Sequence, residues 1–240
     1  MSRWTLPLAG LLGIVIGGIA MYFGGALVRV PAGDRARVEG IVHDYMLSHP
    51  EILPEAMEAL RDKEHATVIA DNRKAILEPV GSAWQGAAAP DLTIVEYFDY
   101  NCGYCRASLP VIDELLAGDP KLRIVYREFP VLGESSGQAA RMSLAAAEQG
   151  KFRAFHDALY AGGSVSADTI AAAAKKAGLD AGRAAAFTPK ADAEIASNMS
   201  IAQQLKLTGT PSWVIGNRVV SSAMPLAELQ RLVARARAKS

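Results

Sequence analysis

The stretch LTIVEYFDYNCGYC, residues 92–105, decides the fold of this 240-residue chain. Its first half, Leu92–Phe98, is a run of apolar, β-branched and aromatic residues, which predicts a buried β-strand. The one acid in that run is Glu96. Apolar residues at helical spacing over 107–116 predict a helix after the two cysteines, and the run 122–129 predicts a second strand. The predicted order is therefore strand, cysteine pair, helix, strand.

Cys102 and Cys105 are the only cysteines in the sequence, and two residues separate them. This spacing is typical of a redox pair of thiols. A cysteine at the N-terminus of a helix lies beside free backbone N–H groups and the positive end of the helix dipole, which stabilise a thiolate. Cys102 is therefore the predicted nucleophile. Cys105, one turn further along and more buried, is predicted to resolve the mixed disulfide.

Other uses of the cysteine pair agree less well with the sequence. A structural zinc site needs about four ligands, and there is no second cysteine pair. A c-type haem site needs His directly after the second cysteine, where this chain has Arg106. A purely structural disulfide would close too short a loop to remove much unfolded-state entropy. Two soft thiols can hold Cu(I), so a copper-binding or copper-protective role stays open. We otherwise expect no metal site and no cofactor.

The region before the quoted stretch is predicted to be a helical stalk, residues 31–80, which could mediate oligomerisation. Apolar residues recur at helical spacing from about residue 34 to residue 77, and Pro50 divides this pattern into two helices. Residues 81–90 are rich in Gly and Ala and read as a linker at the start of the main domain, 81–240.

The region after the second predicted strand is Ala-rich with helical periodicity over about residues 137–207. It predicts an all-helical insertion of four or five helices. Two short strands around a turn at Gly216–Asn217 and a helix over 226–236 close the chain. The predicted breaks between the inserted helices are at Gly150, Gly162–Gly163, Gly178 and Pro189.

The N-terminal segment contains no charged residue from Thr5 to Val28. At a rise of about 1.5 Å per residue, a helix of this length can cross a hydrocarbon layer of about 30 Å. Residues 1–30 are therefore predicted to be a transmembrane anchor, with a cleaved signal segment as the alternative. Both flanks carry arginine, so charge bias does not settle the orientation.

The overall composition excludes some classes of function. The chain has 25 basic and 25 acidic residues, so no field of one sign would attract nucleic acid, and no nucleic-acid partner is expected. Half of the residues are apolar and 21% are charged, which is the composition of a chain that buries a core.

The segment EYFDYNCGYC resembles the active-site strand and helix start of DsbA-like proteins of the thioredoxin superfamily. Pro110 stands where thioredoxin-fold helices commonly have a kinking proline, and Gly209-Thr210-Pro211-Ser212 is similar to the cis-proline loop of that superfamily. These matches extend over about residues 91–240, and the stalk resembles that of longer, oligomeric relatives such as the ScsC group. The resemblance implies an α/β thioredoxin fold with an inserted all-helical subdomain, preceded by the stalk and a membrane-spanning segment.

The resemblance also implies roles for residues other than the cysteines. Pro211 would be a cis-proline that faces the disulfide, and Thr210 would pair through its backbone with an extended substrate chain. Glu96 matches a buried acid that relays the proton of the second cysteine; an acid facing solvent at the strand end is the alternative. The pair between the cysteines, Gly103 and Tyr104, would tune the redox poise and contact substrate.

The function implied is that of a protein thiol-disulfide oxidoreductase, an oxidase or isomerase acting on cysteine-containing exported proteins. Thr210 before the proline resembles isomerase-like relatives, and the apolar stripe of the stalk predicts a homo-oligomer. A membrane redox partner would reoxidise or reduce the pair. The expected location is periplasmic or otherwise extracytoplasmic, with the chain anchored in the inner membrane, or secreted if the segment is cleaved. A non-catalytic, membrane-tethered interaction protein is the remaining alternative.

Overall fold

The computed structural model describes residues 32–238 of the chain. The predicted membrane-spanning segment, Thr5–Val28, lies outside the described residues. Within residues 32–238, no helix is both long enough and apolar enough to cross a membrane. The chain divides into two compact units, the first ending at Glu58 and the second beginning at Ala59.

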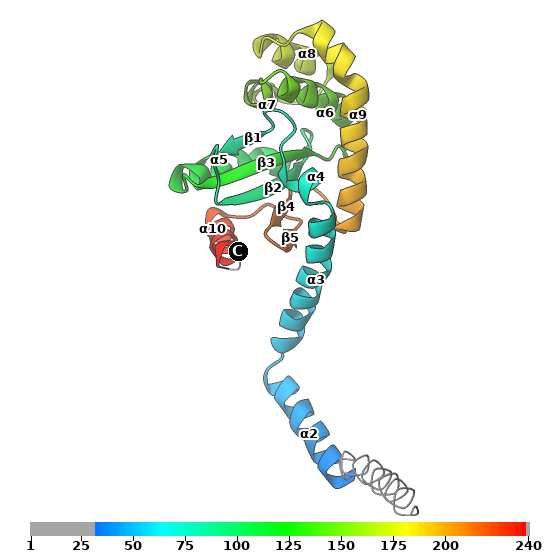
Figure 1. The fold of residues 1–240 in the computed structure, drawn as a ribbon, viewed down its shortest axis with the longest axis vertical. Helices are drawn as coiled ribbons and strands as arrows, with labels where there is room; N and C mark the ends of the chain where they lie inside the picture. The colour runs from blue at the N-terminus through cyan, green and yellow to red at the C-terminus, as the bar shows by residue number, and fades with distance from the viewer. Residues whose placement is uncertain (1–31, 239–240) are drawn as a thin grey trace, which may run out of the picture. The chain divides into compact units, whose positions relative to one another are not determined.

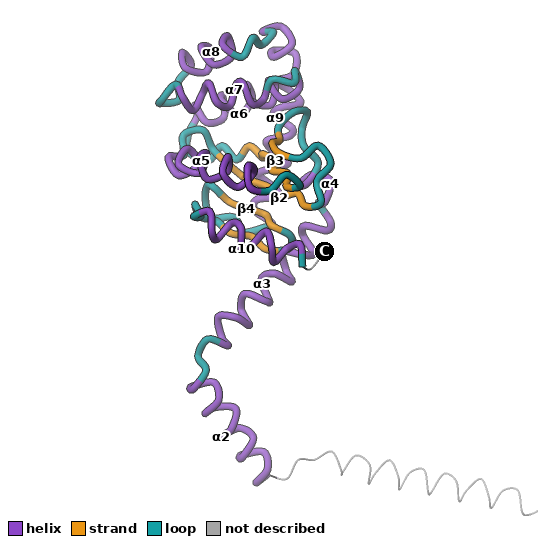
Figure 2. Tube along the Cα trace, turned by 90° about the vertical axis from the view of Figure 1, so that its left-hand side faces the viewer, coloured by secondary structure: helices purple, strands orange, loops and turns teal. Residues whose placement is uncertain are grey.

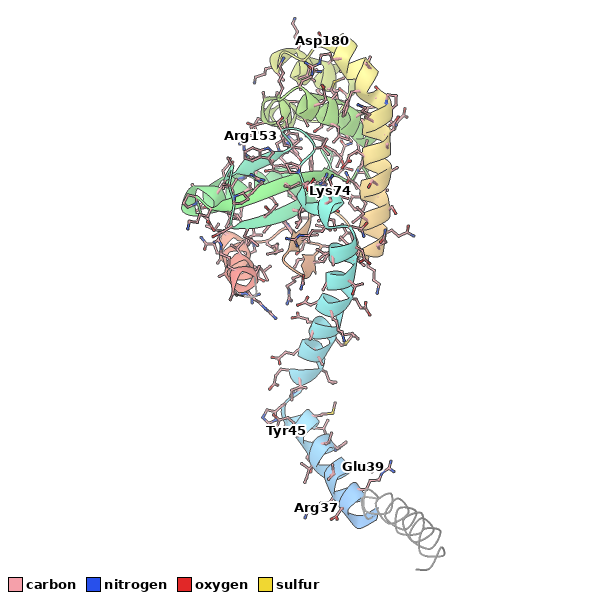
Figure 3. All side chains as sticks on the ribbon, in the orientation of Figure 1. Arg37, Glu39, Tyr45, Lys74, Arg153 and Asp180 are labelled. Carbon is pink, nitrogen blue, oxygen red and sulfur yellow. The ribbon has the colours of Figure 1, made fainter. Side chains whose placement is uncertain are left out.

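The first unit contains the N-terminal part of the stalk, which is helical as predicted. Helix α2 spans Ala32–Ser48, and α3 begins at Ile52 and continues to Asp71 in the second unit. The interruption falls at residues 49–51 because Pro50 cannot donate a helical hydrogen bond. Side chains of α2 such as Arg37, Glu39 and Tyr45 project outward from the helix (Figure 3).

The second unit is built on a five-stranded mixed sheet with the strand order β1-β3-β2-β4-β5 (Figures 1 and 2). The central strands β2 and β3 are parallel, and the other neighbouring pairs are antiparallel. The parallel pair confirms the predicted strand, helix, strand order. The strands are β1 (Trp84–Gly86), β2 (Leu92–Phe98), β3 (Leu122–Glu128), β4 (Ser212–Ile215) and β5 (Arg218–Val220).

Residues 81–90, predicted to be a linker and the entry to the main domain, also contain the short strand β1. Trp84 pairs with Val125 and Gly86 with Arg123, so this segment adds an edge strand beside β3. Gly86 has a φ of +93°, and a Cβ atom at this position would lie 2.3 Å from the carbonyl oxygen of Leu122. The glycine that suggested a linker is therefore required by close backbone approach within a sheet.

Helices cover both faces of the sheet. On one face, α5 (Gly103–Gly118) and α10 (Leu226–Arg237) pack over Ile94 and Trp213, together with part of the helical insertion. On the other face, the end of α3, the short helix α4 (Arg73–Leu77) and the end of α9 pack over Tyr97. The second unit thus begins at Ala59, before the predicted domain start at 81, because the end of the stalk contributes to the core.

The helical insertion between β3 and β4 is confirmed and has four helices (Figure 1). The predicted break at Pro189 is wrong, since α9 runs through this proline. The lost hydrogen bond there is outweighed by packing on both sides, where Ala184 and Ala191 are buried. The inserted helices are α6 (Glu134–Glu148), α7 (Phe152–Ala161), α8 (Ala167–Lys176) and α9 (Ala181–Gln204).

A buried arginine joins three elements of the second unit. Arg127 of β3 is 2% exposed, and its guanidinium donates to the carbonyl oxygens of Ile76 and Glu78 at the end of α4 and to the carboxylate of Glu194 on α9. The Arg127–Glu194 contact is 2.7 Å long. Helices α4 and α9 are thereby fixed to the central sheet.

Candidate active site

The two cysteines lie at the start of α5, directly beyond the carboxyl end of β2. Cys102 is the N-cap residue of this helix and has an extended backbone, with φ −78° and ψ 114°. Its side chain is 6% exposed and that of Cys105 is 1% exposed, and both thiols are unbridged. The residues between them face solvent: Gly103 has open space around it, and Tyr104 is 71% exposed.

The predicted proline loop closes over the first cysteine. The Cys102 thiol donates a hydrogen bond of 3.1 Å to the carbonyl oxygen of Thr210. The peptide bond between Thr210 and Pro211 is cis, as the resemblance implies, and Pro211 is buried. Ser212, the first residue of β4, holds the loop by donating to the carbonyl oxygen of Gly209 over 2.6 Å. The structure thus brings together residues that are more than a hundred positions apart in sequence.

The second cysteine lies in an apolar and acidic environment. Burial, and then the nearby carboxyl group of Glu96, raise the pKa of the Cys105 thiol far above its ordinary value. A backbone hydrogen bond with Asp99 acts in the opposite direction and lowers this pKa, but it is the smaller influence. Cys105 is therefore held as a neutral thiol, and its departure as a thiolate requires a proton donor nearby.

Glu96 is buried below the cysteines and does not face solvent. It is 2% exposed on β2, where its strand neighbours are Tyr126 of β3 and Trp213 of β4. Burial, and then the proximity of Cys102, raise the pKa of its carboxyl group well above the ordinary range. This environment favours the protonated form of the carboxyl group, which can donate a proton to a neighbouring sulfur atom.

Asp99 organises the loop before the cysteines and was not predicted as a site residue. Its buried carboxylate accepts hydrogen bonds from the backbone N–H groups of Asn101, Val131 and Leu132, over 2.8 to 2.9 Å. Its carbonyl oxygen accepts the N–H of Cys102 over 3.0 Å. An aspartate directly after a strand is a frequent turn-forming residue, and this is the signal that could have identified it.

Arg106 and Tyr160 join the cysteine helix to the insertion, and they too were not predicted. The Arg106 guanidinium donates to the carbonyl oxygens of Tyr160 and Gly163 at the end of α7 and lies 5.4 Å from the centre of the Tyr160 ring. The Tyr160 hydroxyl donates to the carbonyl oxygen of Asp99 over 3.3 Å. Nothing local in the sequence indicates these contacts, because they join segments more than 50 residues apart.

An aromatic cluster joins the sheet to the insertion, and the His156 ring contacts the rings of Phe98, Tyr100, Tyr126, Phe152 and Tyr160. The His156 side chain is buried, as expected of a core residue, and its Nδ1 atom lies 3.2 Å from the hydroxyl of Tyr100. Burial, and then the charge of Arg153, lower the pKa of His156 to about 3. Residues 32–238 contain no group of three or more His, Cys, Asp or Glu side chains arranged to hold a metal ion.

Two family models match the chain. The model described as a DSBA-like thioredoxin domain matches residues 93–234. The model described as the copper resistance protein ScsC N-terminal domain matches residues 34–66, within the stalk.

Solved structures with similar folds cover most of the chain. A thioredoxin-like oxidoreductase from Silicibacter pomeroyi is 39% identical, with 70% of this chain and 99% of that chain covered and a TM-score of 0.66. A linker-deletion mutant of Proteus mirabilis ScsC is 26% identical, with 89% and 99% covered and a TM-score of 0.67. The thiol-disulfide exchange protein α-DsbA2 from Wolbachia pipientis is also 26% identical, with 73% and 97% covered and a TM-score of 0.65.

Two curated proteins with similar sequences are Na⁺/H⁺ antiporters of the genus Salinispora. NhaA 3 of Salinispora tropica is 31% identical over 139 residues, and NhaA 1 of Salinispora arenicola is 30% identical over 139 residues. Each match covers 56% of this chain but 21% of the antiporter. The chain therefore spans about a fifth of the length of these curated relatives.

Proposed function

Because the chain belongs to the DSBA-like thioredoxin domain family, we propose that it exchanges thiols and disulfides, and that it forms or isomerises disulfide bonds in exported proteins. The observation that carries this proposal is the placement of two unbridged thiols at the start of α5, one against the carbonyl oxygen of Thr210 and one buried beside Glu96. The named activities of the oxidoreductase and thiol-disulfide exchange relatives agree with it.

The proposed reaction begins with the disulfide form of the pair. A substrate thiolate attacks the sulfur of Cys102, the bond between Cys102 and Cys105 breaks, and a mixed disulfide forms. The sulfur of Cys105 leaves with the electron pair and takes the proton of Glu96. A second substrate thiolate then attacks the mixed disulfide, which releases an oxidised substrate and leaves the pair reduced. In isomerisation, Cys102 of the reduced pair attacks a wrong substrate disulfide instead.

The loop residues of the site have supporting roles in this proposal. Thr210 would pair through its backbone with an extended substrate segment, and Pro211 beside it offers no competing N–H group. Gly103 and Tyr104 are exposed at the rim, so they can contact the substrate on either side of its reacting cysteine. A site that binds an extended substrate through its backbone can accept many substrate sequences.

The experiment that tests this function is the recovery of native activity by a scrambled multi-disulfide substrate, together with the equilibrium of the pair against glutathione. We expect the intact chain to form and reshuffle disulfides, Cys102→Ser to abolish both activities, and Cys105→Ser to accumulate mixed disulfide. An intact chain that neither reduces nor reoxidises a substrate would refute the proposal. That result, with Cys102 unreactive toward alkylation, would favour a non-catalytic tethered protein.

We propose in addition that the stalk self-associates, which would place several cysteine pairs around one substrate. Apolar side chains of α2 such as Val38, Ile41 and Val42 are exposed in the single chain, and the ScsC N-terminal model matches this region. Sedimentation of full-length Ile41→Glu should show dissociation, because burying a charge in an apolar interface is costly. The control is Arg37→Glu on the same helix. Identical sedimentation of both variants and the intact chain would count against association through this stripe.

An extracytoplasmic location, with a membrane redox partner, follows from the proposed substrates. Disulfides persist in oxidising compartments, and a related structure is that of a periplasmic thioredoxin-like protein from Salmonella enterica. The uncharged segment Thr5–Val28 would anchor the chain in the inner membrane, or be cleaved to release it. Carbonate extraction of membranes from cells that express the full chain, followed by mass measurement of its N-terminus, separates the two fates.

A second candidate function is the sequestration of Cu(I) by the same two thiols. The family model that matches residues 34–66 is named for copper resistance, and two adjacent thiols suit a soft monovalent cation. Titration of the reduced protein with Cu(I) against a competing chelator tests it. Tight one-to-one binding that is lost in Cys102→Ser, in a protein without exchange activity, would make copper handling the primary role.

A further inference from the structure

Glu96 needs a route by which its proton is replaced from solvent in each catalytic cycle, and the residues beside it define one. Glu96 and Tyr126 are direct neighbours on the parallel strands β2 and β3, so their side chains stand on the same face of the sheet. Both residues are 2% exposed. The Tyr126 hydroxyl donates to the side-chain oxygen of Gln85 on β1. A line of polar groups thus leads from the acid across β3 to the edge strand.

The far end of this line opens into a cavity of about 350 Å³ between β1, α5 and α7. Gln85, the hydrogen-bond partner of Tyr126, is part of its wall. Four of the cavity's eight lining residues carry a charge, and one of these, Arg153, projects from α7 (Figure 3). A cavity of this size and polarity has room for several water molecules. Its other lining residues are Arg106, Leu109, Asp113, Asp157, Tyr160 and Ala161.

The pKa of the Tyr126 hydroxyl is influenced both by the buried acid and by charged residues of the cavity wall. Burial, and then the charge of Glu96, raise the pKa of Tyr126 well above its ordinary value. The next contributions come from Arg153, Asp113 and Asp157, which are three of the four charged residues of the cavity wall. The phenol group therefore interacts with the buried acid on one side and with the ions of the cavity on the other.

We propose that Tyr126 is a relay residue that carries protons between Glu96 and water in this cavity, with Gln85 holding its hydroxyl in place. The proposal rests on the thiol-disulfide exchange function above. When Cys105 leaves and takes the Glu96 proton, the Tyr126 hydroxyl turns from Gln85 and gives its proton to the carboxylate, directly or through one water. Tyr126 takes a proton from cavity water in the same step, and hydroxide is left in the solvent. The reverse sequence releases the proton when the pair is reoxidised.

Tyr160 is the other phenol near this route, and its hydrogen bonding makes it the poorer relay. It lines the cavity and interacts electrostatically with Cys105 and Glu96. Its hydroxyl, however, is donated to the carbonyl oxygen of Asp99, which also accepts the N–H of Cys102. Turning this hydroxyl would disturb the loop that positions the nucleophile.

The test compares full-length Tyr126→Phe with Tyr97→Phe, a matched control on the opposite face of the same sheet. The Tyr97 hydroxyl is likewise buried, and it has no hydrogen-bond partner among residues 32–238. The measured quantity is the single-turnover rate at which a peptide thiol opens the disulfide between Cys102 and Cys105. The reaction is quenched with acid, and the mixed disulfide formed is quantified. We expect Tyr126→Phe to be at least about tenfold slower, with a larger solvent deuterium isotope effect and partial rescue by imidazole buffer. Gln85→Leu should show the same defect in weaker form.

Several outcomes would overturn the relay. The relay is wrong if the disulfides of Tyr126→Phe and Tyr97→Phe are opened at the same rate with the same isotope effect. It is also wrong if added buffer does not raise the opening rate of the slowed variant. If Tyr126→Phe does not fold, Gln85→Leu with an unchanged rate and isotope effect leads to the same conclusion. Failure of the exchange function itself can be told apart from failure of the relay, because the disulfide of the unmodified protein would then be opened at no measurable rate.

Discussion

His156 should contribute a loss of folding stability in mild acid. Burial lowers its pKa in the folded state from 6.5 to about 3. As pH falls between these two pKa values, His156 binds a proton in the unfolded chain but not in the folded chain, so folding stability is lost with decreasing pH. The full difference corresponds to about 5 kcal/mol, and about 2 kcal/mol of it is lost between pH 8 and pH 5. For a unit of this size that is a decrease in Tm of about 4–8 °C.

The measurement is guanidinium unfolding of the reduced protein at pH 8, 6.5, 5 and 4, compared with His156→Gln. The variant loses ring packing at every pH, so its stability is lower throughout, but its curve should be flatter by about 2 kcal/mol between pH 8 and pH 5. His65, whose pKa is also lowered by partial burial, is present in both proteins and cancels in the difference. Parallel curves would show that His156 is protonated in the folded state and would refute the reasoning.

Three further predictions concern single residues. Glu96→Gln should become more stable relative to the unmodified protein as pH rises above about 4.5. The reason is that the pKa of Glu96 is raised in the folded state, which costs stability once the carboxyl group of the unfolded chain ionises. Denaturant unfolding of both proteins at pH 5 and pH 8.5 measures this difference. Arg127→Met should lose about 3–5 kcal/mol, whereas Arg183→Met, which removes an exposed ion pair, should lose less than about 1 kcal/mol by the same assay. Gly86→Ala should lower Tm by several degrees in calorimetry, since its Cβ would collide with the carbonyl oxygen of Leu122, and an unchanged Tm would contradict the β1 pairing.

The parts of the fold that the sequence predicted are those set by local patterns. The run Leu92–Phe98 alternates between two packed faces and is apolar almost throughout, so its burial could be read without knowing its neighbours. The cysteine pair at a helix start is equally local. The strand β1 could not be found in this way, because three residues have no periodicity of their own and become a strand only by pairing with β3.

The candidate site divides in the same way between local and distant contacts. The positions of Cys102 and Cys105 follow from a short motif, and the resemblance added Pro211 and Glu96. Missing from that set were groups whose role depends on partners from other segments, such as the Asp99 carboxylate and the donors it binds. The helix through Pro189 is a related case, since local propensity favoured a break and tertiary packing overrode it.

The order of segments along the chain has a consequence for how the protein is made. The carbonyl oxygen that accepts the Cys102 thiol belongs to Thr210, 108 residues further along, and the whole insertion lies between them. During synthesis the thiols emerge 108 residues before the loop that contacts Cys102. A nascent chain that stops before that loop would expose both thiols without its cover, and they could react with the disulfides of other molecules. The Cys102 thiol gains this hydrogen-bond partner only after the chain through β4 has been made and β4 has paired with β2.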